Sequence, residues 1–176
     1  MDIQELAIKG VCLITPDKYP DNRGYFFETF NLDKLMSARI FSAETSFCQD
    51  NESFSVARVI RGLHYQKEPF AQGKLVRVVS GRVIDVVVDL RNDSPTYGNY
   101  MMQELDDKHK RIMWIPKGFA HGFVALEDSL FSYKVSGRYM PSYESGIRWD
   151  EPSLNIPWPV QNPIISDKDK KLPFLK

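Results

Sequence analysis

The sequence lacks several features that mark common classes of protein. Lysine plus arginine and aspartate plus glutamate number 23 each, and neither sign forms a long run, so no charged surface is indicated for a nucleic-acid backbone or an anionic membrane. No apolar run approaches membrane-spanning length, and the first residues, MDIQELAIKG, contain no apolar secretory core. We therefore expect a cytoplasmic protein with a small ligand and with neither nucleic-acid nor membrane partners.

Cysteine and histidine are scarce. The two cysteines, Cys12 and Cys48, stand in no CxxC or zinc-ligand spacing, so we expect both to stay reduced and to serve as packing residues. The histidines form no HxH or HExxH motif, and the two in notable contexts, His64 and His121, are 57 positions apart (121 − 64). This spacing argues against a metal site, and we expect neither a metal nor another cofactor.

Helix signals are also sparse, whereas strand signals are frequent. Asn31 is a candidate N-cap for a short helix over 31–41, and 167–171 can form one helical turn. The β-branched runs KLVRVV and RVIDVVVDL, separated by Ser80-Gly81, predict an antiparallel hairpin. Further short apolar runs follow in YMMQEL, RIMWIP, GFVAL and LFSYKVS. Many short strands with turns between them predict a sandwich or a barrel.

Length and composition are those of one compact unit. A chain of 176 residues with 43% hydrophobic residues can bury one substantial core, and we expect a single domain over 1–176. Four prolines between 152 and 163 predict an irregular C-terminal arm that wraps the β core.

The histidines are the natural candidates for proton transfer near neutral pH. His64 lies in RGLHYQ, three residues after Arg61, and Lys74 begins the following strand, so a base and two cations can line one pocket. His121 lies in the turn-rich stretch IPKGFAHGF, and His109, in DDKHK, reads as an exposed turn residue. It is equally open that the histidines are structural and that Arg61 and Lys74 are solvated charges at strand edges.

Other polar residues alternate with aromatic ones in the N-terminal third. In DNRGYFFETF and FCQDNESFS these are Arg23, Glu28, Gln49 and Asn51. Such groups suit sugar hydroxyls and phosphates, although a half-buried strand with one wet face explains the same alternation. Tyr133 and Tyr139, in YKVSGRY, are by the same reasoning more often core or interface residues than proton donors.

Taken together, these segments resemble the dTDP-4-dehydrorhamnose 3,5-epimerase family, nearly from end to end. The matching stretches are DNRGYFFETF, CQDNESFS, RGLHYQ, GKLVRVVSGRVIDVVVDLRNDSPTYG, IPKGFAHGF, YKVSGRYMPSYESGIRWDEPSLNIPWP and SDKDKKLP. The PKGFAH stretch is also similar to the second cupin signature. The resemblance implies an all-β, cupin-type jelly-roll barrel with a few short peripheral helices, no metal, and a homodimer whose N-terminal strands complete the partner's sheet.

The resemblance also implies a role for each matched residue. His64 matches the catalytic base, Asp169 the carboxylate that orients it, Tyr133 the proton donor, and Lys74 the cation near the keto oxygen. Tyr139 matches an aromatic side chain that stacks on the nucleobase. The positions that match substrate contacts are Arg23, Glu28, Gln49, Asn51, Arg61, His121, Glu144 and Lys168.

The implied reaction inverts carbons 3 and 5 of a dTDP-linked 4-keto-6-deoxyhexose in dTDP-L-rhamnose biosynthesis. The sequence departs from the family before RGLH, where Ala57, Arg58, Val59 and Ile60 replace a pattern of lysine, glycine, valine and leucine, and at Arg138, where tyrosine is frequent. Two alternatives remain open: a cupin that inverts one carbon or moves the ketone, and a non-catalytic carbohydrate-binding barrel.

Overall fold

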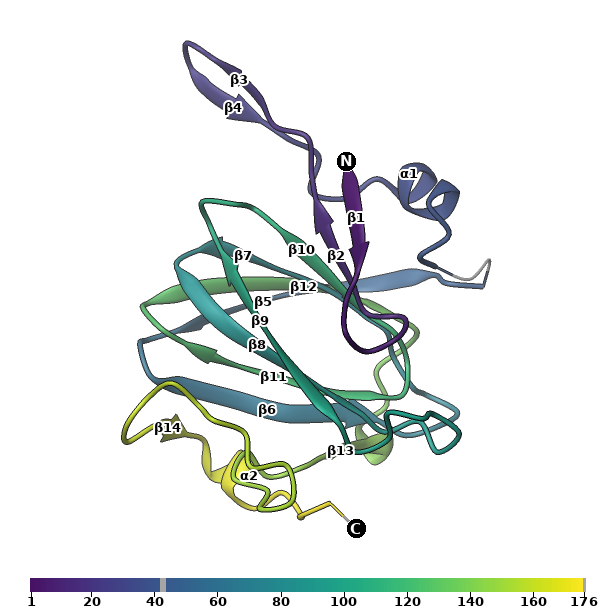
Figure 1. The fold of residues 1–176 in the computed structure, drawn as a ribbon, viewed down its shortest axis with the longest axis vertical. Coiled ribbons are helices and arrows are strands. Elements are labelled where there is room, and N and C mark those ends of the chain that lie inside the picture. The colour runs from purple at the N-terminus through teal and green to yellow at the C-terminus, as the bar shows by residue number, and fades with distance from the viewer. Residues whose placement is uncertain (42–43, 176) are drawn as a thin grey trace.

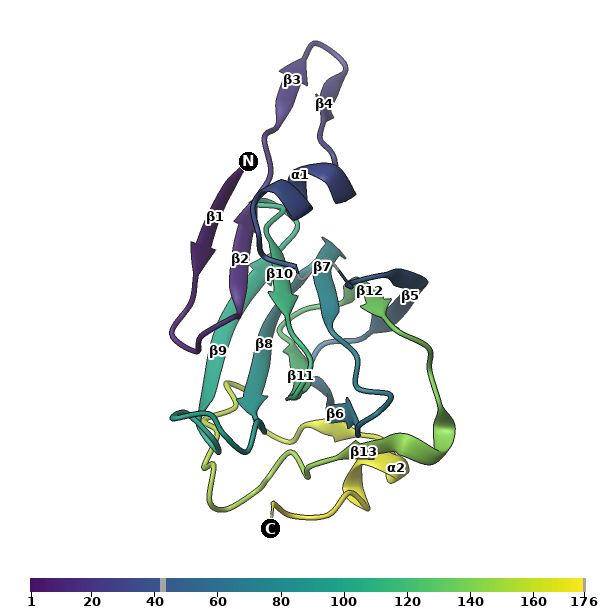
Figure 2. The same ribbon diagram turned by 90° about the vertical axis from the view of Figure 1, so that its right-hand side faces the viewer.

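Two large β-sheets face each other in a jelly-roll-like sandwich (Figures 1 and 2). The computed structural model describes residues 1–41 and 44–175 of the chain. Regular structure in these ranges is nearly all β, and its helices are short and peripheral. The prediction of an all-β, cupin-type jelly roll is confirmed.

The first sheet contains the strands that carry Lys74 and Tyr133. Its spatial order is β1 (Asp2–Glu5), β2 (Cys12–Thr15), β10 (Ile112–Ile115), β7 (Lys74–Ser80), β12 (Ser129–Ser136) and β5 (Phe47–Ser55). All its neighbouring strands are antiparallel.

The second sheet contains the strands that carry His64 and His121. Its order is β13 (Glu144–Gly146), β6 (Val59–Gln66), β11 (Phe119–Ala125), β8 (Arg82–Asp89) and β9 (Tyr100–Asp106), and β14 (Ile164–Ile165) also pairs with β6, in parallel. The 3₁₀ helix η1 (Pro141–Tyr143) precedes β13, and α2 (Asp167–Lys170) follows β14. The C-terminal arm therefore folds back on β6, as its prolines predicted (Figure 1).

The period-two alternation of the strands divides their apolar residues between two faces. Between the sheets, one face of each strand supplies the main core, which includes Val76, Val83, Val87, Met113 and Phe131. The opposite face of the first sheet packs against α1 (Leu32–Ser37), and that of the second packs against the C-terminal arm. The strands covered on both faces are therefore almost continuously apolar.

The predicted hairpin at Ser80-Gly81 is wrong. The two strands exist, but β7 pairs with β10 and β12, whereas β8 pairs with β9 and β11 in the other sheet. Gly81 has φ +88°, and a Cβ there would lie 2.4 Å from the Asp128 carbonyl oxygen. The glycine thus permits a corner at which the chain crosses between sheets, and a hairpin turn would require the same left-handed conformation.

The predicted short helices are confirmed, with tighter bounds. The side chain of Asn31 accepts a hydrogen bond from the Lys34 backbone N–H at 3.1 Å, so it caps α1, which ends at Ser37. Ser166 caps α2 in the same way through the backbone N–H of Asp169 at 3.1 Å. This second cap fixes the turn that carries Asp169.

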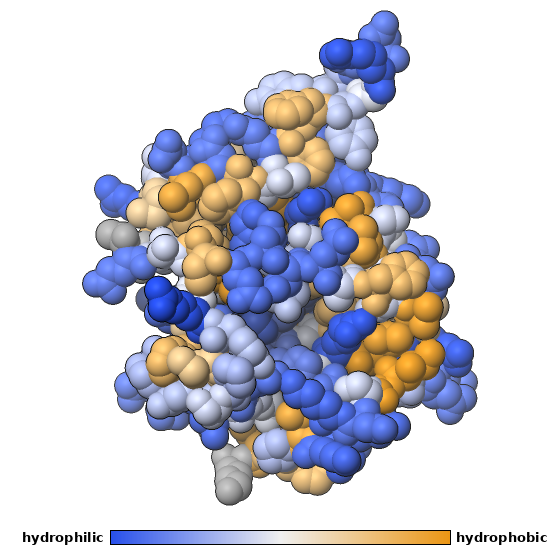
Figure 3. All heavy atoms as spheres, turned by 180° about the vertical axis from the view of Figure 1, so that it is seen from behind, coloured by the Kyte–Doolittle hydropathy of each residue, from blue (hydrophilic) through white to orange (hydrophobic). Residues whose placement is uncertain are grey.

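The hairpin of β3 (Tyr19–Asp21) and β4 (Gly24–Phe26) projects away from the sandwich (Figure 1). Tyr19, Tyr25 and Phe26 on it are more than half exposed. Figure 3 shows a hydrophilic tip on this projection. The hairpin therefore presents apolar rings without a core of its own.

The two cysteines differ in burial. Both have free thiols, and Cys12 packs beneath α1 as predicted. Cys48 is exposed, with its Sγ 2.9 Å from the Gly137 carbonyl oxygen. The expectation that Cys48 is a packing residue is therefore wrong, because β5 is an edge strand and this position faces outward.

The segment after β8 is held by a buried carboxylate. Asp89 is fully buried and accepts hydrogen bonds from Arg91 Nη2 at 2.7 Å, Ser94 Oγ at 2.6 Å and Thr96 Oγ1 at 2.6 Å. Burial raises the pKa of the Asp89 carboxyl, but these hydrogen bonds outweigh it and hold the pKa well below the usual range.

Candidate active site

A cavity of about 490 Å³ lies between the sheets and is lined by residues from both. It is lined by most of the predicted site residues, namely Arg61, His64, Lys74, His121, Tyr133, Lys168 and Asp169. An adjoining cavity of about 300 Å³ shares His64, Lys74 and Tyr133 and adds Gln49, Asn51, Tyr139 and Glu144. The fold thus brings eleven residues, from positions 49 to 169 of the chain, into one continuous site.

His64 and Asp169 form a direct pair across 105 positions of sequence. His64 Nε2 lies 2.7 Å from Asp169 Oδ1, and the other carboxylate oxygen accepts the Gly62 backbone N–H at 3.2 Å. Burial raises the pKa of the Asp169 carboxyl, but the hydrogen bond and charge of His64 outweigh it, and the pKa is lowered. An ionised Asp169 requires the proton on Nε2, so His64 Nδ1 is left free to act as a base.

Lys74 reaches from the first sheet toward the histidines of the second. Its Nζ donates to the His64 carbonyl oxygen at 3.2 Å and lies 3.5 Å from His121 Nδ1. Burial lowers the pKa of Lys74 to about 8, while the charges of Asp85 and Glu144 act in the opposite direction. A cation held in this cavity can stabilise an oxyanion formed nearby.

Tyr133 lies on β12, in the sheet opposite His64, and lines the same two cavities. Burial raises the pKa of its phenol, and the nearby charge of Arg61 acts in the opposite direction. The hydroxyl therefore stays protonated near neutral pH. A protonated phenol facing a histidine from the other sheet is suited to donating a proton.

Glu144 links two elements at the rim of the site. It accepts hydrogen bonds from Lys168 Nζ at 2.6 Å and from the Tyr139 hydroxyl at 2.8 Å. The Tyr139 ring remains about half exposed. These contacts connect α2 to β13 and leave an aromatic face open beside the cavity.

Gln49 and Asn51 lie on β5 and face this rim. The Gln49 amide donates to the Asn51 side-chain oxygen at 2.8 Å. Together they leave further donors and acceptors for a polar ligand in the adjoining cavity.

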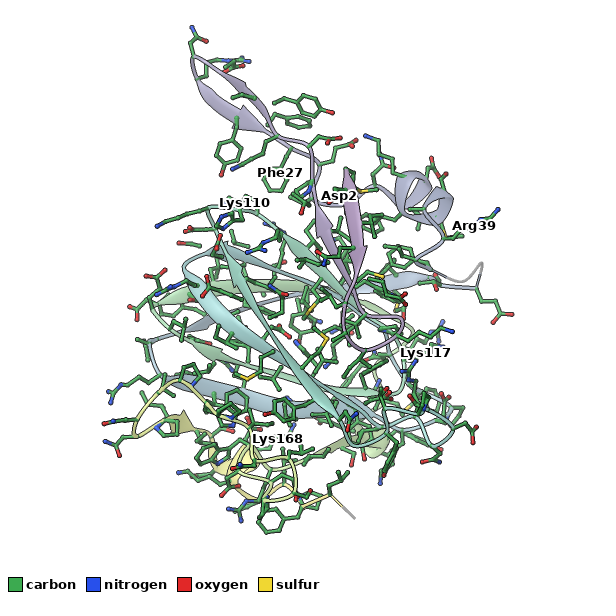
Figure 4. The ribbon with its side chains drawn as sticks, in the orientation of Figure 1. Asp2, Phe27, Arg39, Lys110, Lys117 and Lys168 are labelled. Carbon is green, nitrogen blue, oxygen red and sulfur yellow. The ribbon has the colours of Figure 1, made fainter. Side chains whose placement is uncertain are left out.

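Arg23 and Glu28 do not join the other predicted residues. Arg23 lies next to the tip of the β3–β4 hairpin, where it pairs with Asp21 at 2.6 Å, and Glu28 pairs with Lys34 of α1 at 2.5 Å. Figure 4 shows that Phe27, at the base of the hairpin, and Lys168, on α2, lie on opposite sides of the sandwich. Within one chain, neither side chain lines the cavity of His64.

The environment of His121 differs from the sequence-based prediction. It lies inside β11 rather than in a turn, because the turn is confined to the residues before Phe119. It is buried, its Cα is in register with that of His64 on β6, and its Nε2 lies 2.8 Å from Asp85 Oδ2. Burial lowers the pKa of His121.

Asp85 is the residue that the sequence analysis missed. It is fully buried on β8, on the same face as Val83 and Val87 of the main core. The available signal was a carboxylate at an inward-facing position in the otherwise apolar run VIDVVV. Such a charge requires a partner, and here it is His121.

The departure before RGLH changes the backbone only locally. Arg58, where the family commonly has glycine, adopts φ +71°. Its backbone N–H donates to the Ala125 carbonyl oxygen at 2.8 Å, and β6 pairs with β14 from Val59 and with β11 from Ile60. The strand therefore begins with a non-glycine residue in a strained conformation, and its register with β11 shifts once, between Arg61 and His64.

Neither a metal cluster nor a membrane span is found in the described part of the chain. In residues 1–41 and 44–175, no group of three or more His, Cys, Asp or Glu side chains could hold a metal ion. No helix in these ranges is long and apolar enough to cross a membrane. The expectation of metal-free chemistry remains a prediction.

Comparison with known proteins gives one family over nearly the whole chain. A family model described as dTDP-4-dehydrorhamnose 3,5-epimerase matches residues 5–176. The curated dTDP-4-dehydrorhamnose 3,5-epimerase of Shigella flexneri is 48% identical over 170 residues, which cover 96% of this chain and 93% of the relative.

Solved structures of the same family are similar to this chain over nearly its full length. The enzyme of the same name from Bacillus anthracis, with TDP and PPi bound, has a TM-score of 0.93 at 42% identity and covers 99% of this chain and 100% of its own. The dTDP-6-deoxy-D-glucose-3,5-epimerase of Legionella pneumophila, in complex with dTDP-4-keto-L-rhamnose, has a TM-score of 0.93 at 40% identity, covering 98% and 92% of the two chains. The chain described here therefore belongs to the dTDP-4-dehydrorhamnose 3,5-epimerase family.

Proposed function

We propose that this protein inverts carbons 3 and 5 of a dTDP-linked 4-keto-6-deoxyhexose, as an isomerase of dTDP-L-rhamnose biosynthesis. One observation carries the proposal. The His64–Asp169 pair belongs to the second sheet and its C-terminal arm, whereas Tyr133 and Lys74 belong to the first sheet, and all of them line one cavity. A sugar ring held between the sheets would meet a base on one face and an acid on the other.

The chemistry of the ketone explains why one site can act on two carbons. The 4-keto group acidifies the hydrogens on carbons 3 and 5, because either carbanion delocalises onto the carbonyl oxygen as an enolate. His64 removes the proton, and Asp169 stabilises the imidazolium that results. Lys74 stabilises the enolate oxygen, and Tyr133 returns a proton from the opposite face.

The remaining residues of the cavities provide a site for the nucleotide. Tyr139 offers an exposed ring for stacking on a base. Arg61 and Lys168 supply positive charge for the diphosphate, and Gln49 and Asn51 supply amides. The family members from Bacillus anthracis and Legionella pneumophila are described with TDP and with a dTDP-sugar bound, which supports the same carrier here.

We further propose a homodimer in which the N-terminal strands are exchanged, so that Arg23 and Glu28 reach the partner's site. The projecting hairpin and its exposed rings support this arrangement. Mixing Arg23→Ala protein with His64→Ala protein, after a denaturation and refolding step, should restore part of the activity, because mixed dimers contain one site with neither defect. Activity no higher than that of the separate variants, or a monomer in sedimentation, would refute the exchange.

The remaining properties are proposed on simpler grounds. Two free thiols support a reducing, cytoplasmic location. We propose that residues 1–176 work as one domain, because the C-terminal arm supplies a residue to a site built on both sheets. Metal-free chemistry predicts full activity after exhaustive chelation, and loss that is reversed by added metal would refute it.

Incubation of the substrate with enzyme in deuterated water tests the reaction itself. Inversion of both carbons incorporates two deuterium atoms into the sugar ring, which mass spectrometry and proton NMR locate. Incorporation at a single carbon would instead identify a single-centre epimerase or a ketoisomerase. Tight binding in calorimetry with no exchange would identify a carbohydrate-binding protein without catalysis.

A further inference from the structure

Two buried side chains, His121 and Asp85, form a row behind the proposed reacting groups. His64 and His121 are directly paired on neighbouring strands, and Asp85 lies on the next strand, β8. His121 Nε2 lies 2.8 Å from Asp85 Oδ2, and His121 Nδ1 lies 3.5 Å from Lys74 Nζ. The imidazole of His121 therefore connects a buried carboxylate to the cation at the site.

The carboxylate of Asp85 is unfavourable for folding stability at its buried position. Asp85 has no exposed surface, and its Oδ1 has no hydrogen-bond partner among the described residues. An unpaired oxygen on a buried carboxylate destabilises the folded state, and apolar residues surround it on the strand. Packing alone would be better served by another valine at this position.

The tautomer of His121 follows from its two contacts. An ionised carboxylate only accepts hydrogen bonds, so His121 Nε2 must carry the proton that points at Asp85. Nδ1 then presents a lone pair, and the Lys74 ammonium can donate to it. The opposite tautomer would direct an N–H at the ammonium and repel it.

We propose that Asp85 is a positioning residue that acts through His121, fixing its tautomer and supplying the negative charge that keeps Lys74 protonated and aimed into the cavity. This inference rests on the proposed role of Lys74 at the enolate oxygen. It adds Asp85 to the functional residues without placing it in contact with the substrate.

The charges around Lys74 fit this arrangement. Burial raises the pKa of Asp85 and lowers that of Lys74, while the charge of each group opposes the shift of the other. The other titratable or charged groups that line the cavities near Lys74 are Arg61, His64, Tyr65, His121, Tyr133, Tyr139, Glu144, Lys168 and Asp169. Glu144 acts in the same direction as Asp85 on Lys74.

Asp85→Asn tests the inference with little change in volume. The amide can donate to His121 Nε2 and so favour the wrong tautomer, as the equivalent change does in serine proteases. We expect kcat to fall by about 10- to 100-fold, the range for outer partners that orient a functional histidine. KM should change little, and the alkaline limb of the kcat profile should move down by about one pH unit or more, because a neighbouring opposite charge is lost.

Asp89→Asn is the matched control, because Asp89 is a fully buried carboxylate on the same strand that lines neither cavity. It should lower stability without moving the alkaline limb. The double variant Asp85→Asn/His121→Asn provides a second control: on the plateau below the alkaline limb, where Lys74 is charged in every variant, a residue that acts through His121 adds no further loss of kcat once that histidine is gone. The proposal would be overturned if the losses of kcat in the two single variants multiplied in the double variant, or if the pH profile of Asp85→Asn were unchanged.

If Asp85→Asn fails to fold, NMR spectroscopy of the wild-type protein tests the proposed role of Asp85. Nitrogen-15 NMR of its histidines should show His121 neutral with the proton on Nε2, and carbon-13 NMR of its lysines should show Lys74 titrating well below the others. A proton on Nδ1 would refute the proposed positioning even in an active enzyme. Absence of turnover by wild-type protein would refute the proposed function and leave these two spectra as the test of the buried row.

Discussion

The charge on Lys74 should control the rate, and this can be tested by Lys74→Met and by pH together. Methionine keeps much of the apolar stem and removes the ammonium. Loss of one donor to an oxyanion typically costs about 3 to 4 kcal/mol, so kcat should fall by on the order of 100- to 1000-fold. KM should change little, because the interaction strengthens only as the enolate forms.

The pH dependence of kcat in the wild-type enzyme gives a second, independent measure of how the charge on Lys74 affects the rate. With the pKa of Lys74 lowered to about 8, the charged fraction is about nine tenths at pH 7 and about one tenth at pH 9. Activity should therefore fall about tenfold per pH unit above that point and level off near the rate of Lys74→Met. The assay is kcat from pH 6.5 to 10, with circular dichroism to confirm that the protein stays folded.

Two results would refute this reasoning. A kcat that stays constant to pH 10 would mean that Lys74 either keeps its proton or is not needed in charged form. A Lys74→Met variant that raises KM while keeping kcat would make Lys74 a ground-state binding residue. Lys74→Arg is the informative control, since guanidinium does not titrate in this range, and any activity that it retains should lack the alkaline limb.

Four further outcomes are expected. His64→Asn should abolish turnover and solvent exchange while dTDP binding by calorimetry persists; near wild-type activity would exclude His64 as the base. Tyr133→Phe should keep exchange with deuterated water but form the doubly inverted sugar slowly or stop after one inversion, and product at the wild-type rate would make the hydroxyl structural. Asp89→Ala should lower the free energy of unfolding in urea by about 3 to 5 kcal/mol, because Arg91 loses its buried partner. The pKa of Asp89 is depressed in the folded state. The stability that Asp89 contributes is therefore complete above about pH 4 and is lost as pH falls toward the folded-state pKa. Arg58→Gly should raise the same free energy by about 1 kcal/mol by relieving φ +71°, and a loss of stability would contradict that account.

The strands were predictable from sequence, but their partners were not. β-branched runs located β7 and β8. A glycine with positive φ can close a hairpin or turn a corner between sheets, and only long-range packing decides between them. Residues 74–89 were therefore assigned the right local structure and the wrong pairing.

The candidate site was also only partly predictable: sequence signals located several residues but not the contacts between them. A histidine three residues after an arginine, with a lysine at the start of the following strand, was a visible signal, and the structure places these residues in one cavity. The pairing of His64 with Asp169 came only from resemblance to a family, because no spacing rule connects positions 105 apart. Asp85 was missed because a single carboxylate in an apolar strand has no local motif, and Arg23 lies apart because its hairpin extends beyond the fold.

Because His64 and Tyr133, the proposed base and acid, lie on opposing sheets, the packing of the core sets the distance between them. Facing sheets pack about 10 Å apart, and here Phe131, Val76 and Val87 act as the spacer between them. Because such a core is close-packed and compresses little, it holds His64 and Tyr133 at a fixed separation. Trimming a spacer residue such as Val87 would let the sheets approach, so a substitution that never touches the sugar would alter the length of each proton's path.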